Sequence, residues 1–216
     1  MPLDAKLVHH LQKILTMVDD HGSSSHRLLE DARRLWGRVR RFMGITPIDP
    51  AKLDLEAMEL ACYALQFPHR RARSAQPTRT ARPTVRERSE EAIEMLIRLA
   101  GKDAGEDLLE RTARILREMH QRSPGIDEAK LLTDAVSLDD FGVMGLLRLA
   151  VQTARKGGGV SEVTDGIEKR IQYGYWEARL KDGFHFESTQ SFARRRLENA
   201  RKAAELLKAE LDEDSM

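Results

Sequence analysis

The sequence predicts an all-α protein, and three features of it support this fold class. Apolar residues recur at helical spacing through most of the 216-residue chain. No run alternates apolar and polar positions with the β-branched residues typical of strands. Glycine, proline and serine interrupt the helical pattern at intervals that suit ordinary helix lengths. We therefore expect a single helical domain over residues 1–216 with about eight or nine helices.

The predicted helices are bounded by residues that commonly start or stop a helix. Gly22 and Gly44 follow apolar runs, and Asp49 before Pro50 predicts an N-cap with proline at the first helical position. Gly101 is expected to close a helix in the middle of the chain. The expected helices cover about residues 3–18, 26–43, 51–66, 85–99 and 104–120, two helical runs within 128–156, then 161–180 and 188–211.

The third predicted helix, residues 51–66, is apolar on more than one side near its end. A helix of this kind is expected at the centre of a core.

An arginine- and proline-rich segment at about 67–88 interrupts the helical pattern and predicts a long loop. One interpretation is a solvated insertion. The other is a phosphate-binding lid or nucleic-acid contact, in which Arg70, Arg71 and Arg73 hold phosphate groups through paired guanidinium hydrogen bonds. The segment between Pro68 and Arg88 contains no aromatic residue, which disfavours base stacking.

The composition excludes several classes of protein. With 36 Lys+Arg against 35 Asp+Glu, the chain lacks the strong positive charge of a dedicated nucleic-acid binder. Cys62 is the single cysteine, so no intramolecular disulfide can form, and its apolar surroundings predict a small buried side chain. No signal peptide and no apolar run long enough to span a membrane is present, so we expect a cytoplasmic protein without membrane contact.

Motifs with a known chemistry do not supply a function. The sequence has no HExxH, Walker, EF-hand or GxSxG pattern. Residues 157–159 are three glycines without the lysine of a phosphate loop, and they predict a hinge. Asp139 and Asp140 are adjacent, so their side chains diverge, and one of them is expected to cap a helix.

Five segments, in order along the chain, carry a resemblance to a known family. They are a histidine pair around a turn at His21 and His26, the apolar run LACYALQF at 60–67, a helix ending in Ile115 to His120, EAKLLTDAVSLDDFGVMG at 128–145, and FHFESTQSFARRR at 184–196. With these segments the chain resembles the small standalone members of the HD-domain metal-dependent phosphohydrolase superfamily.

The resemblance implies an HD-domain-like helical bundle and a particular chemistry. Proteins of this superfamily bind a divalent metal through an early histidine, an adjacent His-Asp pair and a distant aspartate. The metal activates water for attack on a phosphate ester, often in a nucleotide. Carried onto this sequence, the resemblance implies a pocket formed by His26, Gln66, Phe67, His120, Asp134, Val136 and Arg148.

The chain departs from the family pattern at the metal ligands. His26 matches the first ligand, and it is the one metal-binding residue that the resemblance retains. Gln66 and Phe67 stand in place of the His-Asp pair, and Val136 stands in place of the final aspartate. Phenylalanine and valine offer no donor atom to a divalent ion. The resemblance therefore implies a pseudo-hydrolase without a cofactor, with a pocket retained for a nucleotide or another phosphorylated small molecule.

Two alternatives stay open. The first is an active phosphohydrolase whose divalent metal is held by a rebuilt site that includes His26, His120 and Asp134, with His69 as a further candidate ligand. The second is a helical interaction protein, or a nucleic-acid-associated one, that uses the arginine-rich loop. Whether the chain is an enzyme is open, no catalytic residue is assigned from the sequence, and a homodimer is compatible with all three interpretations.

Structural roles compete with the functional ones at the pocket residues. His26 could start a helix, and His120 could interact with the negative end of a helix dipole. Asp134 is expected to act as an N-cap or a buried hydrogen-bond acceptor. Arg148 is expected to pair with Asp134 or a neighbouring acid.

Replacing Gln66→His, Phe67→Asp and Val136→Asp together is expected to create metal binding, because the three changes supply the missing nitrogen and oxygen donors. Metal analysis of the purified variant measures this. A triple variant that folds and stays free of metal would show that these positions do not correspond to the family's ligands.

Overall fold

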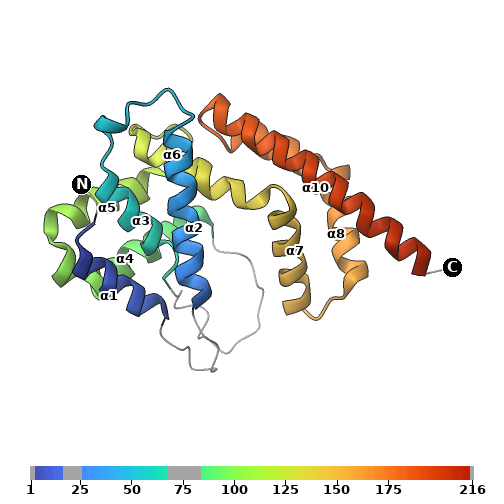
Figure 1. Cartoon of the computed structure of the whole chain (residues 1–216), viewed down its shortest axis with the longest axis horizontal. Coiled ribbons are helices and arrows are strands. Elements are labelled where there is room, and N and C mark those ends of the chain that lie inside the picture. The colour runs from blue at the N-terminus through green and yellow to red at the C-terminus, as the bar shows by residue number, and fades with distance from the viewer. Residues whose placement is uncertain (1–2, 17–25, 68–83, 215–216) are drawn as a thin grey trace. The chain divides into compact units, whose positions relative to one another are not determined.

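The computed structural model of the chain describes residues 3–16, 26–67 and 84–214, and it confirms the all-α fold class. These residues form ten α-helices and two short 3₁₀ helices, with no strand among them (Figure 1). The α-helices are α1 Ala5–Thr16, α2 His26–Met43, α3 Leu55–Ala64, α4 Val85–Ala104, α5 Glu106–Glu118, α6 Asp127–Ser137, α7 Val143–Arg155, α8 Val160–Gln172, α9 Tyr175–Asp182 and α10 Glu187–Asp214.

The chain divides into two compact units, Met1–Leu132 and Thr133–Met216, which we call the N-terminal and C-terminal units. The division falls within α6. The expectation of a single domain over residues 1–216 stays a prediction.

The N-terminal unit is built around α3. Seven of its ten residues are buried, and it packs against α2, α4 and α5. Figure 1 shows α3 beside α2 and next to α5. The central place expected for this helix is therefore confirmed, and it follows from apolar residues on more than one of its sides.

The start of the third helix differs from the prediction. Asp49 does act as an N-cap, since its carboxylate accepts a hydrogen bond from the amide of Ala51 at 3.0 Å, but it caps a 3₁₀ helix, η1 at Pro50–Lys52. The α-helix begins later, where Asp54 accepts a hydrogen bond from the amide of Ala57 at 3.0 Å. Asp49 therefore caps the short 3₁₀ helix, and Asp54 caps the central α-helix that follows it.

The boundary between α4 and α5 also differs from the prediction. The sequence predicts that Gly101 closes α4, but the helix continues through Gly101 to Ala104. Gly105 separates the two helices, and its φ of +75° lies in a region that suits glycine. At its other end, α4 begins with a capping box between Thr84 and Glu87. The predicted loop at 67–88 falls largely on residues 68–83, which lie outside the described residues.

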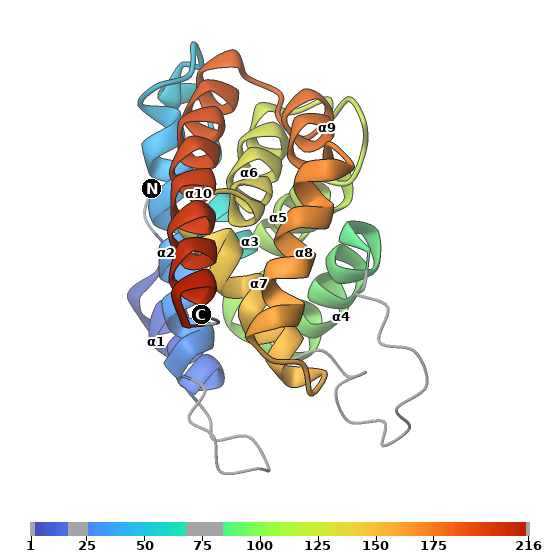
Figure 2. The same ribbon diagram turned by 90° about the vertical axis from the view of Figure 1, so that its right-hand side faces the viewer.

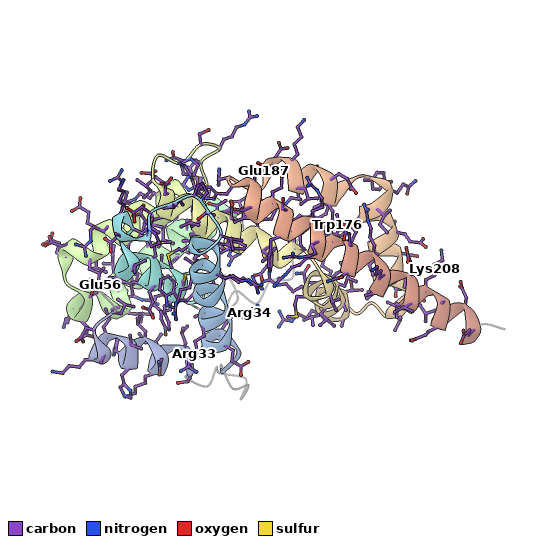
Figure 3. The ribbon with its side chains drawn as sticks, turned by 45° about the horizontal axis from the view of Figure 1, so that its top comes forward. Arg33, Arg34, Glu56, Trp176, Glu187 and Lys208 are labelled. Atoms are coloured by element: carbon purple, nitrogen blue, oxygen red, sulfur yellow. The ribbon has the colours of Figure 1, made fainter. Side chains whose placement is uncertain are left out.

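The C-terminal unit packs α7, α8, α9 and α10 together (Figures 1 and 2). The single helix predicted over 161–180 is two helices, because Gly174 takes a left-handed conformation with φ +61° between α8 and α9. Trp176 of α9 is buried, and Figure 3 shows this residue together with Glu187 at the start of α10. The last helix, predicted at 188–211, runs from Glu187 to Asp214.

None of the helices in the described part of the chain is long and apolar enough to cross a membrane.

Two glycines bring α7 close to its neighbours. Gly142, the N-cap residue of α7, has φ +78°, and a Cβ there would lie 3.3 Å from the Cβ of Arg196. A Cβ on Gly145 would lie 2.6 Å from the carbonyl oxygen of Asp140. Asp140 belongs to η3, the 3₁₀ helix Leu138–Asp140, so glycine at position 145 allows the first turn of α7 to fold back onto η3.

We expect Gly145→Ala to lower the free energy of unfolding by about 1–3 kcal/mol, because the added methyl group meets backbone atoms that have little room to move. Gly37→Ala is the matched control. Gly37 is exposed within α2, and a Cβ there meets no atom within 4 Å. This control is expected to stabilise the protein by about 0.5–1 kcal/mol. Urea unfolding of both variants measures the two effects, and equal stabilisation by both would contradict the close approach.

Candidate functional site

The best-formed polar arrangement in the C-terminal unit surrounds Asp134 on α6. Its side chain is fully buried. One carboxylate oxygen accepts a hydrogen bond from the amide of His185 at 2.8 Å. The other accepts from the amide of Phe186 at 3.3 Å and from the Thr189 hydroxyl. Asp134 therefore joins α6 to the start of α10, where helix amides need an acceptor and the helix dipole favours a negative charge.

Burial changes the acidity of Asp134. The pKa of its carboxyl group is raised from 3.8 to about 6, because burial disfavours the charged form. The hydrogen bonds from Thr189 and from the amides of His185 and Phe186 act in the opposite direction. The three donors engage both carboxylate oxygens. Asp134 therefore acts as a structural hydrogen-bond acceptor and is not free to exchange protons with a substrate.

The acids of η3 are held by neighbouring arginines and aromatic residues. Asp139 forms an ion pair with Arg148 of α7, with 2.6 Å between Oδ2 and Nη1. The carboxylate of Asp140 accepts from the hydroxyl of Tyr175 at 3.3 Å and lies 3.4 Å from Nη2 of Arg179. The sequence predicts that Arg148 pairs with Asp134 or a neighbouring acid, and the structure pairs it with the neighbouring acid Asp139.

The backbone of η3 is fixed as well. The indole Nε1 of buried Trp176 donates to the carbonyl oxygen of Asp140 at 2.9 Å. The guanidinium of Arg170 lies over the rings of Tyr175 and Trp176, at 4.9 and 5.9 Å from their centroids. Burial raises the pKa of the Tyr175 hydroxyl, and the nearby charge of Asp140 raises it further.

In the N-terminal unit, the residues that stand in place of the His-Asp pair of the resembled family lie in the turn that follows α3. Phe67 is 2% exposed and is among the largest fully buried side chains. Gln66 is half-buried, and its backbone N–H donates to the carbonyl oxygen of Tyr63. His120 lies in the turn after α5 with an exposed side chain. Phe67 therefore fills a place in the hydrophobic core, and an aspartate there would have to be buried.

Several predicted residues lie outside the described part of the chain. These are the side chain of His26 and the whole of His69, Arg70, Arg71 and Arg73. Their proposed roles in metal and phosphate binding stay predictions.

The side chains present do not fit the metal of the resembled family. Gln66 offers a neutral amide oxygen, Phe67 offers only carbon, and half-buried Val136 on α6 offers only methyl groups. Within the described ranges, no group of three or more His, Cys, Asp or Glu side chains is arranged to hold a metal ion. The expectation of no cofactor nonetheless remains a prediction.

Sequence reasoning missed the partners of Asp134. The sequence singles out Thr189 only as part of the segment FHFESTQSFARRR. Its hydrogen bond to Asp134, 55 residues earlier, is a long-range contact that the sequence pattern does not reveal. It likewise missed Tyr175 and Trp176 as partners of Asp140, because both aromatic residues fall on an ordinary helical apolar pattern.

The fold and these contacts define the chain as an all-α protein with a tightly fixed α6–η3–α7 segment. Comparison with protein-family models finds no match, and comparison with curated proteins finds none either.

Several solved structures, in contrast, are similar to this chain over nearly its whole length. Bacillus subtilis YpgQ in complex with ADP has 18% sequence identity and a TM-score of 0.57, and the match covers 95% of this chain and 94% of that one. YpgQ in a second structure has the same identity and TM-score, with 95% and 97% covered. The Lin1889 protein from Listeria innocua has 15% identity and a TM-score of 0.56, with 95% and 97% covered. At these identities the similarity shows a shared fold.

The raised pKa of Asp134 predicts a pH dependence of stability. Between about pH 4 and pH 6, the folded protein keeps a proton on Asp134 that the unfolded chain has released, so the free energy of unfolding falls as the pH rises. A shift from 3.8 to about 6 corresponds to about 3 kcal/mol over this window. Asp134→Asn removes this contribution, so we expect the variant to gain stability relative to the wild type as the pH rises.

Urea unfolding at several pH values between 4 and 7 measures the difference between the two proteins. Asp165→Asn, at an exposed position on α8, is the matched control and should keep the slope of the wild type. If Asp134→Asn also keeps that slope, Asp134 does not titrate as described.

Proposed function

We propose that this chain is an HD-type helical protein that binds a nucleotide or another phosphorylated small molecule, without the metal chemistry of the HD hydrolases. The observation that carries the proposal is the fold similarity, over 95% of the chain, to a protein whose structure was solved with ADP. The five sequence segments that resemble the HD superfamily support it independently.

The identity of the residues at the family's ligand positions supports the non-hydrolytic part of the proposal. A rebuilt site that includes Asp134 would have to compete with three donors that already engage its carboxylate. At position 67, a buried phenylalanine replaces a charged ligand. Without several nitrogen or oxygen donors, a bound water keeps its high pKa and is a poor nucleophile towards phosphorus.

Titration of the full chain with ADP tests the proposal directly. We expect calorimetry to detect binding with one site per chain, with an affinity that excess EDTA leaves unchanged, and we expect ADP to stay intact with or without Mn²⁺. Absence of binding to ADP and ATP at millimolar concentration would overturn the proposed function. Metal-dependent hydrolysis that EDTA abolishes would instead establish the active phosphohydrolase with a rebuilt site.

The arginine-rich segment supplies a sharper variant. Arg70→Ala, Arg71→Ala and Arg73→Ala together are expected to weaken ADP binding by at least about tenfold, because a hydrogen bond to a charged group is worth roughly 1.5–3 kcal/mol. The matched control carries Arg117→Ala, Arg122→Ala and Arg155→Ala, which remove the same charge from exposed positions on other segments. Equal weakening by both variants would mean that only overall charge matters.

The same pair of variants separates nucleotide binding from nucleic-acid binding. Binding of a single-stranded oligonucleotide that falls steeply with salt and disappears in the loop variant would favour the nucleic-acid alternative.

A further inference from the structure

The C-terminal unit leaves much of its apolar surface uncovered. Eight of the eleven large apolar side chains that are exposed in the described chain belong to this unit, although the N-terminal unit is the larger of the two. Four of the eight lie on α7, and the others are Val160, Ile171, Tyr173 and Leu206. Exposed apolar residues that gather on one element indicate an interaction surface, whereas scattered ones need no explanation.

The four residues on α7 form one stripe, which we call the α7 stripe: Val143, Met144, Leu147 and Val151. They are 45%, 40%, 53% and 47% exposed. At about 100° per residue, these positions fall within roughly 100° of the helix circumference. The buried residues of the helix, Gly145 and Leu146, lie outside this arc. The surface of α7 that faces solvent is therefore apolar, the reverse of an ordinary surface helix.

We propose that the α7 stripe is a self-association surface, and that it pairs with the α7 stripe of a second copy of this chain in antiparallel orientation about a two-fold axis. Val143 and Val151 lie four residues before and after Leu147. An antiparallel pair centred on Leu147 therefore places each valine opposite the other valine of the partner copy and Leu147 opposite itself. A two-fold interface requires this kind of self-complementary pattern.

Charge favours the antiparallel orientation. Exposed Arg155 and Lys156 stand at the C-terminal end of α7. Antiparallel pairing keeps the two basic ends apart and opposes the two helix dipoles. Parallel pairing would bring the two basic ends together, which like-charge repulsion disfavours.

The size of the surface predicts a weak dimer. From Val143 to Val151 the stripe is about 12 Å long at 1.5 Å per residue. A stable interface buries about 800 Å² on each partner, which is more than one short helix face supplies. We therefore expect a dimer that forms at high protein concentration and dissociates on dilution, with a dissociation constant on the order of 10–100 μM, at the weak end of specific association.

Sedimentation equilibrium of the full chain, from a few micromolar to the highest soluble concentration, tests the proposal. The wild type is expected to shift from monomer to dimer, and Leu147→Glu is expected to remain monomeric, because two carboxylates facing each other at a two-fold axis repel and cannot replace the apolar contact. Ile97→Glu places the same charge at an exposed apolar position on α4 and should dimerise as the wild type does. A wild type that is monomeric throughout, or a Leu147→Glu variant that still dimerises, would overturn the proposal.

Cross-linking locates the surface. On antiparallel helices with axes about 8–10 Å apart, residues that face each other across the axis have Cα atoms close enough for a short bis-maleimide to join. Leu147→Cys is therefore expected to give a covalent dimer, and Ile97→Cys is not. Native Cys62 supplies little background, because it is buried and burial raises the pKa of its thiol. Equal cross-linking at positions 97 and 147 would contradict the α7 stripe, and neither result depends on nucleotide binding.

Discussion

The buried carboxylate of Asp134 is the interaction on which the C-terminal unit most depends. It receives the amides of His185 and Phe186 and the hydroxyl of Thr189, so it fixes where the longest helix of the chain, α10, begins. Burial of a carboxylate is costly, and three donors are close to what such a group needs to be tolerated. Loss of any one donor would leave the buried carboxylate with less compensation, which makes this part of the fold sensitive to small changes.

Next to this anchor, η3 and the start of α7 are held from three directions. Trp176 binds a backbone carbonyl of Asp140, Tyr175 and Arg179 reach its carboxylate, and Gly145 permits direct backbone approach. These contacts explain why an acidic run, which in isolation suggests catalysis, can serve to position helices. Acids that are already paired with arginine or aromatic hydroxyl groups are less available to a substrate than their number in the sequence suggests.

Much of the fold was accessible from the sequence, because helical periodicity and helix-capping residues are local signals. The central place of α3 followed from its apolar composition, and Asp49 acts as a cap as expected, although for a 3₁₀ helix. The break at Gly174 and the continuation of α4 through Gly101 were not predictable, since a glycine in a helical pattern can either end a helix or be tolerated. Tertiary packing decides between the two outcomes, and a single sequence does not reveal that packing.

The candidate site was less predictable than the fold, for a related physical reason. A carboxylate that binds metal and a carboxylate that anchors a helix are the same residue type, and only their partners distinguish them. The partners of Asp134 lie more than 50 residues away in the sequence. At position 67, in contrast, the residue type itself carries the information, because a phenylalanine that is 2% exposed can contribute packing but no ligand atom. Under the proposed function, this buried apolar side chain stabilises the core at a position where the resembled hydrolases place a charged ligand, so the helical framework does not depend on metal chemistry.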